Sequence, residues 1–163
     1  MTGIGASLAL TQKEFRSISI PTEIEVPDYV FRGIKVNTLN IGDGCYLCED
    51  AFKNASIGSL YIGKNVGFQA NSERNAFSSS NIFDVSDAAQ ISRLEIHSNI
   101  IDGGFQKCGL TSLIIGNEVT KIGAKAFKQN SGLSNATIQN TEGSITIGSD
   151  AFPTTTTINY TGN

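Results

Sequence analysis

The chain of 163 residues has no tryptophan, one methionine and one histidine. A single imidazole, His97, leaves a zinc site short of ligands, and a Ser-His-Asp or Cys-His arrangement would depend on that one residue. No G-x-S-x-G or H-E-x-x-H motif is present. We therefore expect a protein that is not an enzyme and that needs no metal or cofactor.

The sequence is also poor in charge and in long apolar runs. Charged residues make up 17% of the chain, and the net charge is −3, whereas about 25% is typical of soluble domains. Lysine and arginine are scattered singly, so we expect no nucleic-acid partner. Apolar runs such as 113–115 are too short for membrane insertion. The first residues lack the basic start and the apolar core of a signal peptide, so segment 1–17 is interpreted as an N-terminal arm or cap.

Only three cysteines are present, an odd number that excludes a complete disulfide framework. Cys45 and Cys48 form a C-x-x-C motif without a second pair. We predict that all three cysteines are buried within repeats; whether Cys45 and Cys48 form a disulfide stays open.

A repeat is the main signal in the sequence. Ala-Phe occurs four times, and two further phenylalanines keep the same phase, which gives Phe31, Phe52, Phe77, Phe105, Phe127 and Phe152. The steps are 21, 25, 28, 22 and 25 residues, within the range of leucine-rich repeats, about 20–29 residues. Each phenylalanine is predicted to fill the core of one repeat.

Short alternating triplets recur in phase with the phenylalanines and indicate half-buried strands. They are residues 18–20, 39–41, 60–62, 94–96, 113–115, 136–138 and 158–160. Five residues before each phenylalanine stands Val26, Leu47, Ser72, Ile100, Ile122 or Ile147, which suggests a second short extended piece. The pattern predicts a mainly β leucine-rich-repeat solenoid over residues 18–163, with about six to seven irregular rungs and little helix.

The segment Ile122–Phe127, preceded by Leu113–Val119, resembles the BspA-like (Treponema pallidum type) leucine-rich repeat, whose unit runs roughly L-x-x-I-x-I-P-x-x-V-x-x-I-G-x-x-A-F-x-x-C. Residues 147–152 repeat the same motif, and the resemblance covers about residues 18–160. The sequence departs from the family pattern in two ways. Proline occurs at the strand exit only at Pro21, and Ser72 replaces the usual isoleucine. The family occurs in bacterial surface adhesins, protist surface proteins and phage-encoded proteins, so the resemblance implies interaction work.

Three places are candidates for binding. The middle residues of the triplets should form an outward stripe, with Asn40, Tyr61, Glu95, Ile114 and Thr137 as its members of interest. One step between triplets is 34 residues, which predicts an inserted loop near 78–90 with Phe83 as a candidate contact. Ile158 and Tyr160 form the last rung, an end surface that we expect to dock another molecule. A solvated face and a neutral loop are the alternatives for the stripe and the insertion.

The pattern as a whole favours a non-catalytic protein-interaction or structural module of a virion (phage-type) or surface assembly, located on a virion or cell surface. Its partner would be a protein, either another copy or another assembly component, and possibly a glycan. The alternative is an exported adhesin-like module that binds host protein or glycan. No signal peptide is visible, which favours the interpretation as a virion component over an exported module.

Overall fold

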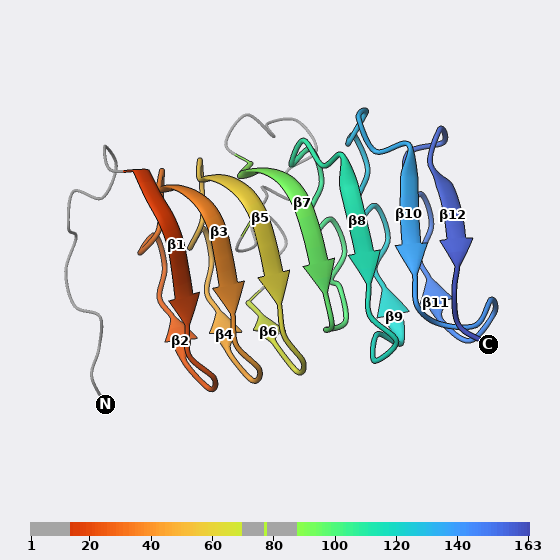
Figure 1. Ribbon diagram of the computed structural model, residues 1–163, viewed down its shortest axis with the longest axis horizontal. Coiled ribbons are helices and arrows are strands. Elements are labelled where there is room, and N and C mark those ends of the chain that lie inside the picture. The colour runs from red at the N-terminus through yellow and green to blue at the C-terminus, as the bar shows by residue number, and fades with distance from the viewer. Residues whose placement is uncertain (1–13, 70–76, 78–87) are drawn as a thin grey trace.

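The computed structural model describes residues 14–69, 77 and 88–163, which form a row of stacked rungs (Figure 1). One wall is a parallel sheet of seven strands in the order β1-β3-β5-β7-β8-β10-β12. The strands are β1 (Glu14–Ile20), β3 (Lys35–Ile41), β5 (Ser56–Ile62), β7 (Gln90–Ile96), β8 (Ser112–Ile115), β10 (Asn135–Ile138) and β12 (Thr157–Tyr160). β1 begins at Glu14, so the end of segment 1–17 is already part of this sheet.

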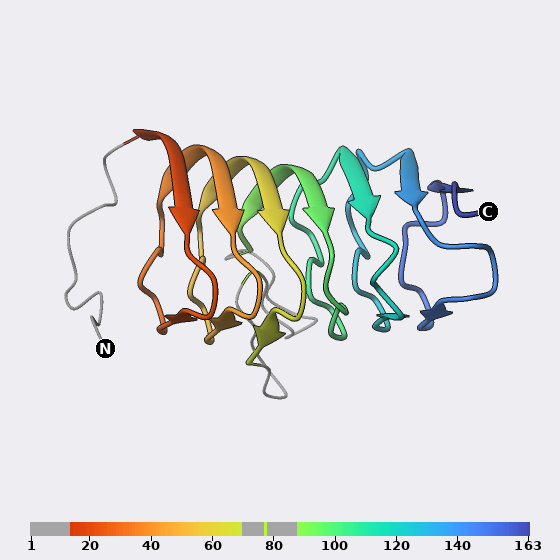
Figure 2. The same ribbon diagram turned by 60° about the horizontal axis from the view of Figure 1, so that its bottom comes forward.

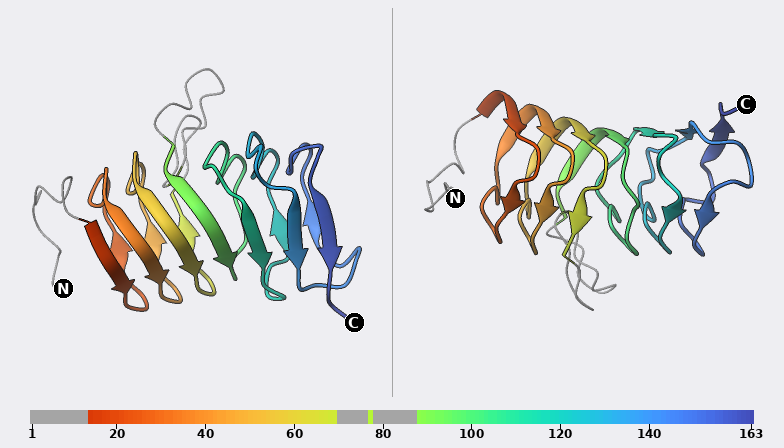
Figure 3. Two further views of the ribbon diagram at one scale, coloured as in Figure 1. Left: turned by 45° about the horizontal axis from the view of Figure 1, so that its top comes forward. Right: turned by 90° about the horizontal axis from the view of Figure 1, so that it is seen from below.

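Strands of two residues each lie across the coil from this sheet (Figures 2 and 3). β2 (Glu25–Val26), β4 (Tyr46–Leu47) and β6 (Gly67–Phe68) form one parallel group, and β9 (Lys121–Ile122) pairs with β11 (Thr146–Ile147). An isolated parallel bridge joins Ile100 to Ile122. The described residues contain no helix, and so none that is long and apolar enough to cross a membrane.

The triplets predicted from alternation are confirmed as the strands of the large sheet, and they pair in register. Leu60 pairs with Leu39 on one side and with Leu94 on the other, and Leu94 pairs with Leu113. In β3, β5, β7, β8 and β10 the outer two residues of each triplet are buried, because successive strand residues point to opposite faces. A mainly β leucine-rich-repeat solenoid is therefore confirmed.

The six phenylalanines form one stack through the core. Neighbouring ring centroids from Phe31 to Phe152 lie 5.3, 4.8, 5.1, 5.9 and 5.3 Å apart, and every pair is stacked. Six successive rungs contribute one ring each to this stack, so no rung could bury its phenylalanine without its neighbours. The prediction that the phenylalanines fill the core is confirmed.

The third rung departs from the predicted spacing. Phe68, not Ser72, pairs with Leu47 in the short-strand group. Phe68 stands nine residues before Phe77, whereas Leu47 stands five before Phe52. Ser72 lies outside the described residues, as does most of the predicted loop. At the end of the predicted loop, Ala88 and Ala89 are buried in the core and Gln90 is the exposed first residue of β7.

The three cysteines are buried free thiols, as predicted for repeat cysteines. The Cys45 thiol donates to the carbonyl oxygen of Pro21, one rung away. Burial raises the pKa of the Cys108 thiol. The open question of a Cys45–Cys48 disulfide is answered by two separate thiols.

A candidate docking groove and its charge clamp

Two rows of side chains cross the outward face of the seven-stranded sheet. The first row holds the middle residues of the triplets, and register places Tyr61 beside Glu95 and Glu95 beside Ile114. The second row lies two residues earlier in each strand and places Ser59 beside Arg93 and Arg93 beside Ser112. Parallel pairing thus brings together side chains that are about 20–35 residues apart in the chain.

A shallow groove of about 270 Å³ lies over β3, β5, β7 and β8. Both rows contribute to its lining, which consists of Thr38, Asn40, Ser59, Leu60, Tyr61, Arg93, Leu94, Glu95, Ser112 and Ile114. Leu60 and Leu94 are buried strand residues and form the floor. The groove is therefore a mixed surface, with one aromatic ring, the aliphatic side chain of Ile114 above the two leucines, two charges and several short polar groups.

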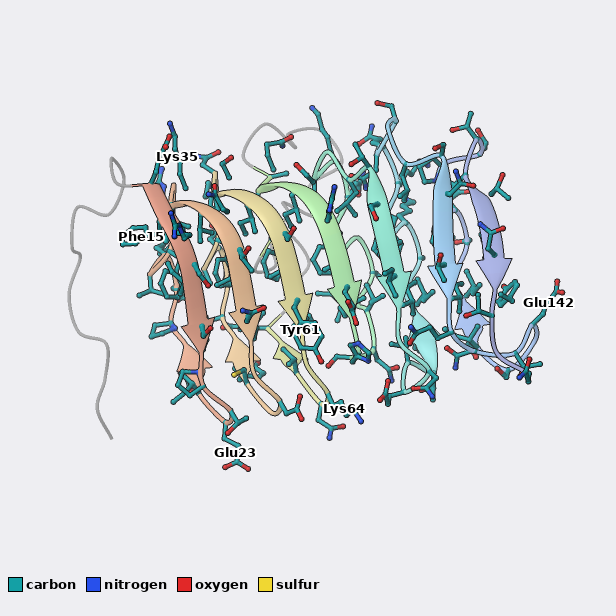
Figure 4. The ribbon with its side chains drawn as sticks, in the orientation of Figure 1. Phe15, Glu23, Lys35, Tyr61, Lys64 and Glu142 are labelled. Carbon is teal, nitrogen blue, oxygen red and sulfur yellow. The ribbon has the colours of Figure 1, made fainter. Side chains whose placement is uncertain are left out.

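Among the described residues of this face, Tyr61 is the large hydrophobic side chain that remains exposed, at 37%. Figure 4 shows it on the sheet surface near the ends of β5 and β7, with Lys64 on the turn that follows β5. The Tyr61 ring lies 5.4 Å from the imidazole of His97, centroid to centroid. Partial burial, followed by the charge of Glu95, raises the pKa of the tyrosine hydroxyl, so it stays a neutral group in the groove.

His97 follows β7 and is held on both ring nitrogens. Nε2 lies 2.9 Å from Oε1 of Glu95, and Nδ1 lies 2.9 Å from Oε2 of Glu118. An ionised carboxylate only accepts hydrogen bonds, and a neutral imidazole has one N–H. Both contacts are therefore hydrogen bonds only when His97 is the doubly protonated imidazolium. We call His97, Glu95 and Glu118 together the charge clamp.

The pKa of His97 follows from competing effects. Burial of the ring disfavours the charged form and alone would lower the pKa, but the hydrogen bonds to Glu118 and Glu95 and their negative charges outweigh burial and raise the pKa. On the other side of the pair, hydrogen bonds from Lys64 and His97 lower the pKa of Glu118 to about 2. The clamp is thus favoured in its fully charged form.

The clamp depends on two neighbouring rungs. Lys64, after β5, forms an ion pair with Glu118 at 2.7 Å between Nζ and Oε1. A side chain at Gly116 would collide with Nδ1 of His97 and would lie 2.8 Å from Oε2 of Glu118. Glycine at this position therefore leaves room for the imidazole to reach the carboxylate. Lys64, His97 and Glu118 also border a second hollow of about 410 Å³, lined in part by Asn65, Ser98 and Asn99.

The two carboxylates and the imidazole do not make a metal site. The carboxylates bind opposite nitrogens of the ring, so one cation could not contact His97 and both acids together. Within the described part of the chain, no group of three or more histidine, cysteine, aspartate or glutamate side chains could hold a metal ion.

Comparison with known proteins agrees with the geometry of the repeats. One family profile, described as a BspA type leucine rich repeat region of six copies, matches residues 4–98 and 74–161. The chain belongs to the BspA-type leucine-rich repeat family. No curated protein matches it, and no solved structure does. Repeats of this family generally serve as protein-interaction modules and not as enzymes.

The BspA-type chain brings together four of the five predicted stripe residues. Asn40, Tyr61, Glu95 and Ile114 line the groove, whereas Thr137, on β10, lies outside it. Ile158 and Tyr160 lie on β12, half-buried and packed against the core. Phe83 lies outside the described residues.

The prediction missed Arg93 and the row of hydroxyls beside it, because only the middle residue of each triplet was considered. The signal was available, since residues two apart in a strand share a face. The sequence of this BspA-type chain contains no pattern that would have predicted the role of Glu118 in the clamp, because Glu118 lies on a turn whose path depends on the tertiary fold.

Proposed function

We propose that this BspA-type repeat protein is a non-catalytic module that binds a protein partner on the outward face of its seven-stranded sheet. The observation that carries the proposal is the groove, which gathers Tyr61 and Ile114 on either side of Glu95. Aromatic residues are enriched where proteins bind one another, and a rim of short polar groups is usual there. The remaining stripe positions are smaller or polar.

A non-catalytic role is supported by the state of His97, the one histidine in the sequence. Carboxylates occupy both of its nitrogens, so no nitrogen is left to take a proton from a nucleophile. The nearby Ser98 hydroxyl is buried and donates to the carbonyl oxygen of Gly63. His97 and Ser98 therefore do not form a pair of base and nucleophile.

The docking face can be tested by photo-crosslinking from two exposed tyrosines on opposite walls. Tyr61 lies on the large sheet at 37% exposure, and Tyr46 lies on β4 at 44%. Each tyrosine would be replaced in turn by the photoreactive analogue p-benzoylphenylalanine, in the cells or particles that contain the protein. A protein crosslinked from position 61 and not from position 46 supports the proposal, and crosslinks from position 46 alone, or from neither, would overturn it.

We place this binding in an assembly on a virion or cell surface, in line with the membership in the BspA-type family. In the alternative, the chain is an exported adhesin-like module that binds host protein or glycan, as the hydroxyl and amide groups of the groove would permit. Accessibility of the protein to an impermeant biotinylation reagent on intact virions or cells tests the surface location. Labelling only after lysis would contradict it.

A second docking place is proposed at β12, where Ile158 and Tyr160 are half-buried. β12 pairs with β10 on one side, and no strand among the described residues pairs with its other side. The occupant would be another copy or another assembly component, because an open strand edge is a template for pairing. Light scattering coupled to size exclusion, on the wild type and Tyr160→Lys, tests this: assembly lost in the variant supports it, and monomers in both contradict self-association.

A further inference from the structure

The two charged side chains of the groove differ in whether they already have a partner. Arg93 and Glu95 lie two residues apart on β7 and therefore share the outward face. Glu95 receives a hydrogen bond from Nε2 of His97 at 2.9 Å. Arg93 is exposed and has no ion pair or hydrogen bond within the described part of the protein. The uncompensated charge of the groove is therefore positive.

The neighbours of Arg93 in the sheet add hydrogen-bond donors on both sides. Register places Ser59 on β5 and Ser112 on β8 directly beside it, and adjacent strands are about 4.8 Å apart. Neither hydroxyl has a hydrogen-bond partner among the described residues. A guanidinium binds a carboxylate through two parallel hydrogen bonds, and a hydroxyl at either side can donate to the same oxygens.

The next row provides apolar contact close to this cation. Tyr61 and Ile114 lie on either side of Glu95, one alternation along the strands from Ser59 and Ser112. The volume of about 270 Å³ is below the range usual for cofactor or drug-sized sites, about 300–1,000 Å³. It suits one or two side chains presented by a larger partner.

We propose that the groove recognises an acidic group of a protein partner, an aspartate, a glutamate or a chain-terminal carboxylate, which binds Arg93 between Ser59 and Ser112 while an adjacent apolar side chain packs on Tyr61 and Ile114. This inference rests on the proposed function and names the chemistry of the partner. A sugar would leave hydroxyls unpaired against Ile114 and would find the carboxylate of Glu95 already engaged by His97. A protein segment with neighbouring acidic and apolar side chains satisfies both rows.

The test uses 3-phenylpropionate, which joins a carboxylate to a phenyl ring, and 3-phenylpropionamide, which has the same shape without the charge. Each is titrated into the isotope-labelled full chain, and backbone amide shifts are followed by NMR. We expect millimolar binding of the carboxylate with shifts confined to the groove, and binding of the amide weaker by about tenfold or more. Arg93→Gln should lose the preference for the carboxylate, and Arg93→Lys should keep part of it.

Lys35→Gln is the matched control, because Lys35 is an exposed cation at the start of β3 that already pairs with Glu14, 4.0 Å away. It should bind the carboxylate as the wild type does. Equal binding of carboxylate and amide, shifts outside the groove, or an equal loss in Lys35→Gln would overturn the proposal. Unchanged amide spectra in the unliganded variants show that they remain folded.

Glucuronate and glucose serve as a second pair of probes. If glucuronate binds the groove and 3-phenylpropionate does not, the occupant is an acidic glycan and the proposal is wrong. The crosslinking experiment separates this proposal from the proposed function. If a protein crosslinks from position 61 but the groove shows no selectivity for a carboxylate, the docking face stands and its acidic partner is wrong. If the groove selects the carboxylate but no protein crosslinks, the groove binds an acidic group and the proposed protein docking is wrong.

Discussion

Oε2 of Glu118 lies 2.9 Å from Nδ1 of His97, although the two residues are 21 positions apart in the chain. The contact connects the turn after β8 to the end of β7, and through His97 it reaches Glu95 in the groove. The charge clamp thus orients a groove-lining carboxylate from a neighbouring rung.

His97→Gln should lower the free energy of unfolding by about 2 kcal/mol near pH 6, because hydrogen bonds to charged groups are lost. The pKa of His97 is raised in the folded state, so its contribution is fully present below the unfolded pKa of about 6.5 and is lost as the pH rises through the folded value. Urea denaturation of both proteins between pH 6 and 9 should therefore show a difference that shrinks with pH. A difference that is constant or grows would contradict the imidazolium clamp.

Glu118→Gln should lower the pKa of His97. The substitution replaces a charged acceptor that raises this pKa by a neutral amide oxygen, while the burial that lowers the pKa remains. NMR titration of the single imidazole measures the shift directly. Glu142→Gln, a change on the turn between β10 and β11, is the control and should leave the titration where it is.

Gly116→Ala should disturb the clamp more than the fold. The added methyl group would meet the imidazole of His97 and the carboxylate of Glu118, so we expect a lower His97 pKa and a loss of about 1–3 kcal/mol. In Gly132→Ala the new atom would meet only the methyl group of Thr111 at 3.2 Å and the carbonyl oxygen of Leu110 at 3.6 Å. The control should therefore leave the histidine titration unchanged.

Phe127→Ala should destabilise the solenoid by about 3–5 kcal/mol, because a fully buried ring is replaced by a cavity. The ring of Phe127 is stacked between Phe105 and Phe152. Phe152, which is half-buried, should cost clearly less when replaced by alanine. Chemical denaturation of the two variants would refute the core stack if both changes cost the same small amount.

Asn130→Ala should cost about 3 kcal/mol. The side chain is fully buried, its Oδ1 accepts from the backbone N–H of Leu110, and its Nδ2 donates to the carbonyl oxygens of Phe105 and Phe127. Removal leaves these backbone groups buried without their partner. Asn135→Ala, at an exposed strand position, should change the free energy of unfolding by less than about 0.5 kcal/mol.

The sequence by itself determined the repeat, its strands and the phenylalanine stack. The triplet at 60–62 and its six counterparts were recognisable because alternation is local, and Phe31 to Phe152 were recognisable because a repeated phase is a one-dimensional signal. Alternation also placed Tyr61 and Ile114 on the outward face.

Only the tertiary structure decided which of these outward residues share a groove and which charges are compensated. His97 contacts Glu118 because the turn after β8 brings the carboxylate back to the end of β7, and no residue in the described ranges compensates Arg93 in this way. Phe68 occupies the place predicted for Ser72 because the register of a rung is set by its pairing with the rung before it, and a count of residues does not contain that pairing. Distances across the stack depend on the lengths and paths of the turns, and these are settled only when neighbouring rungs pack.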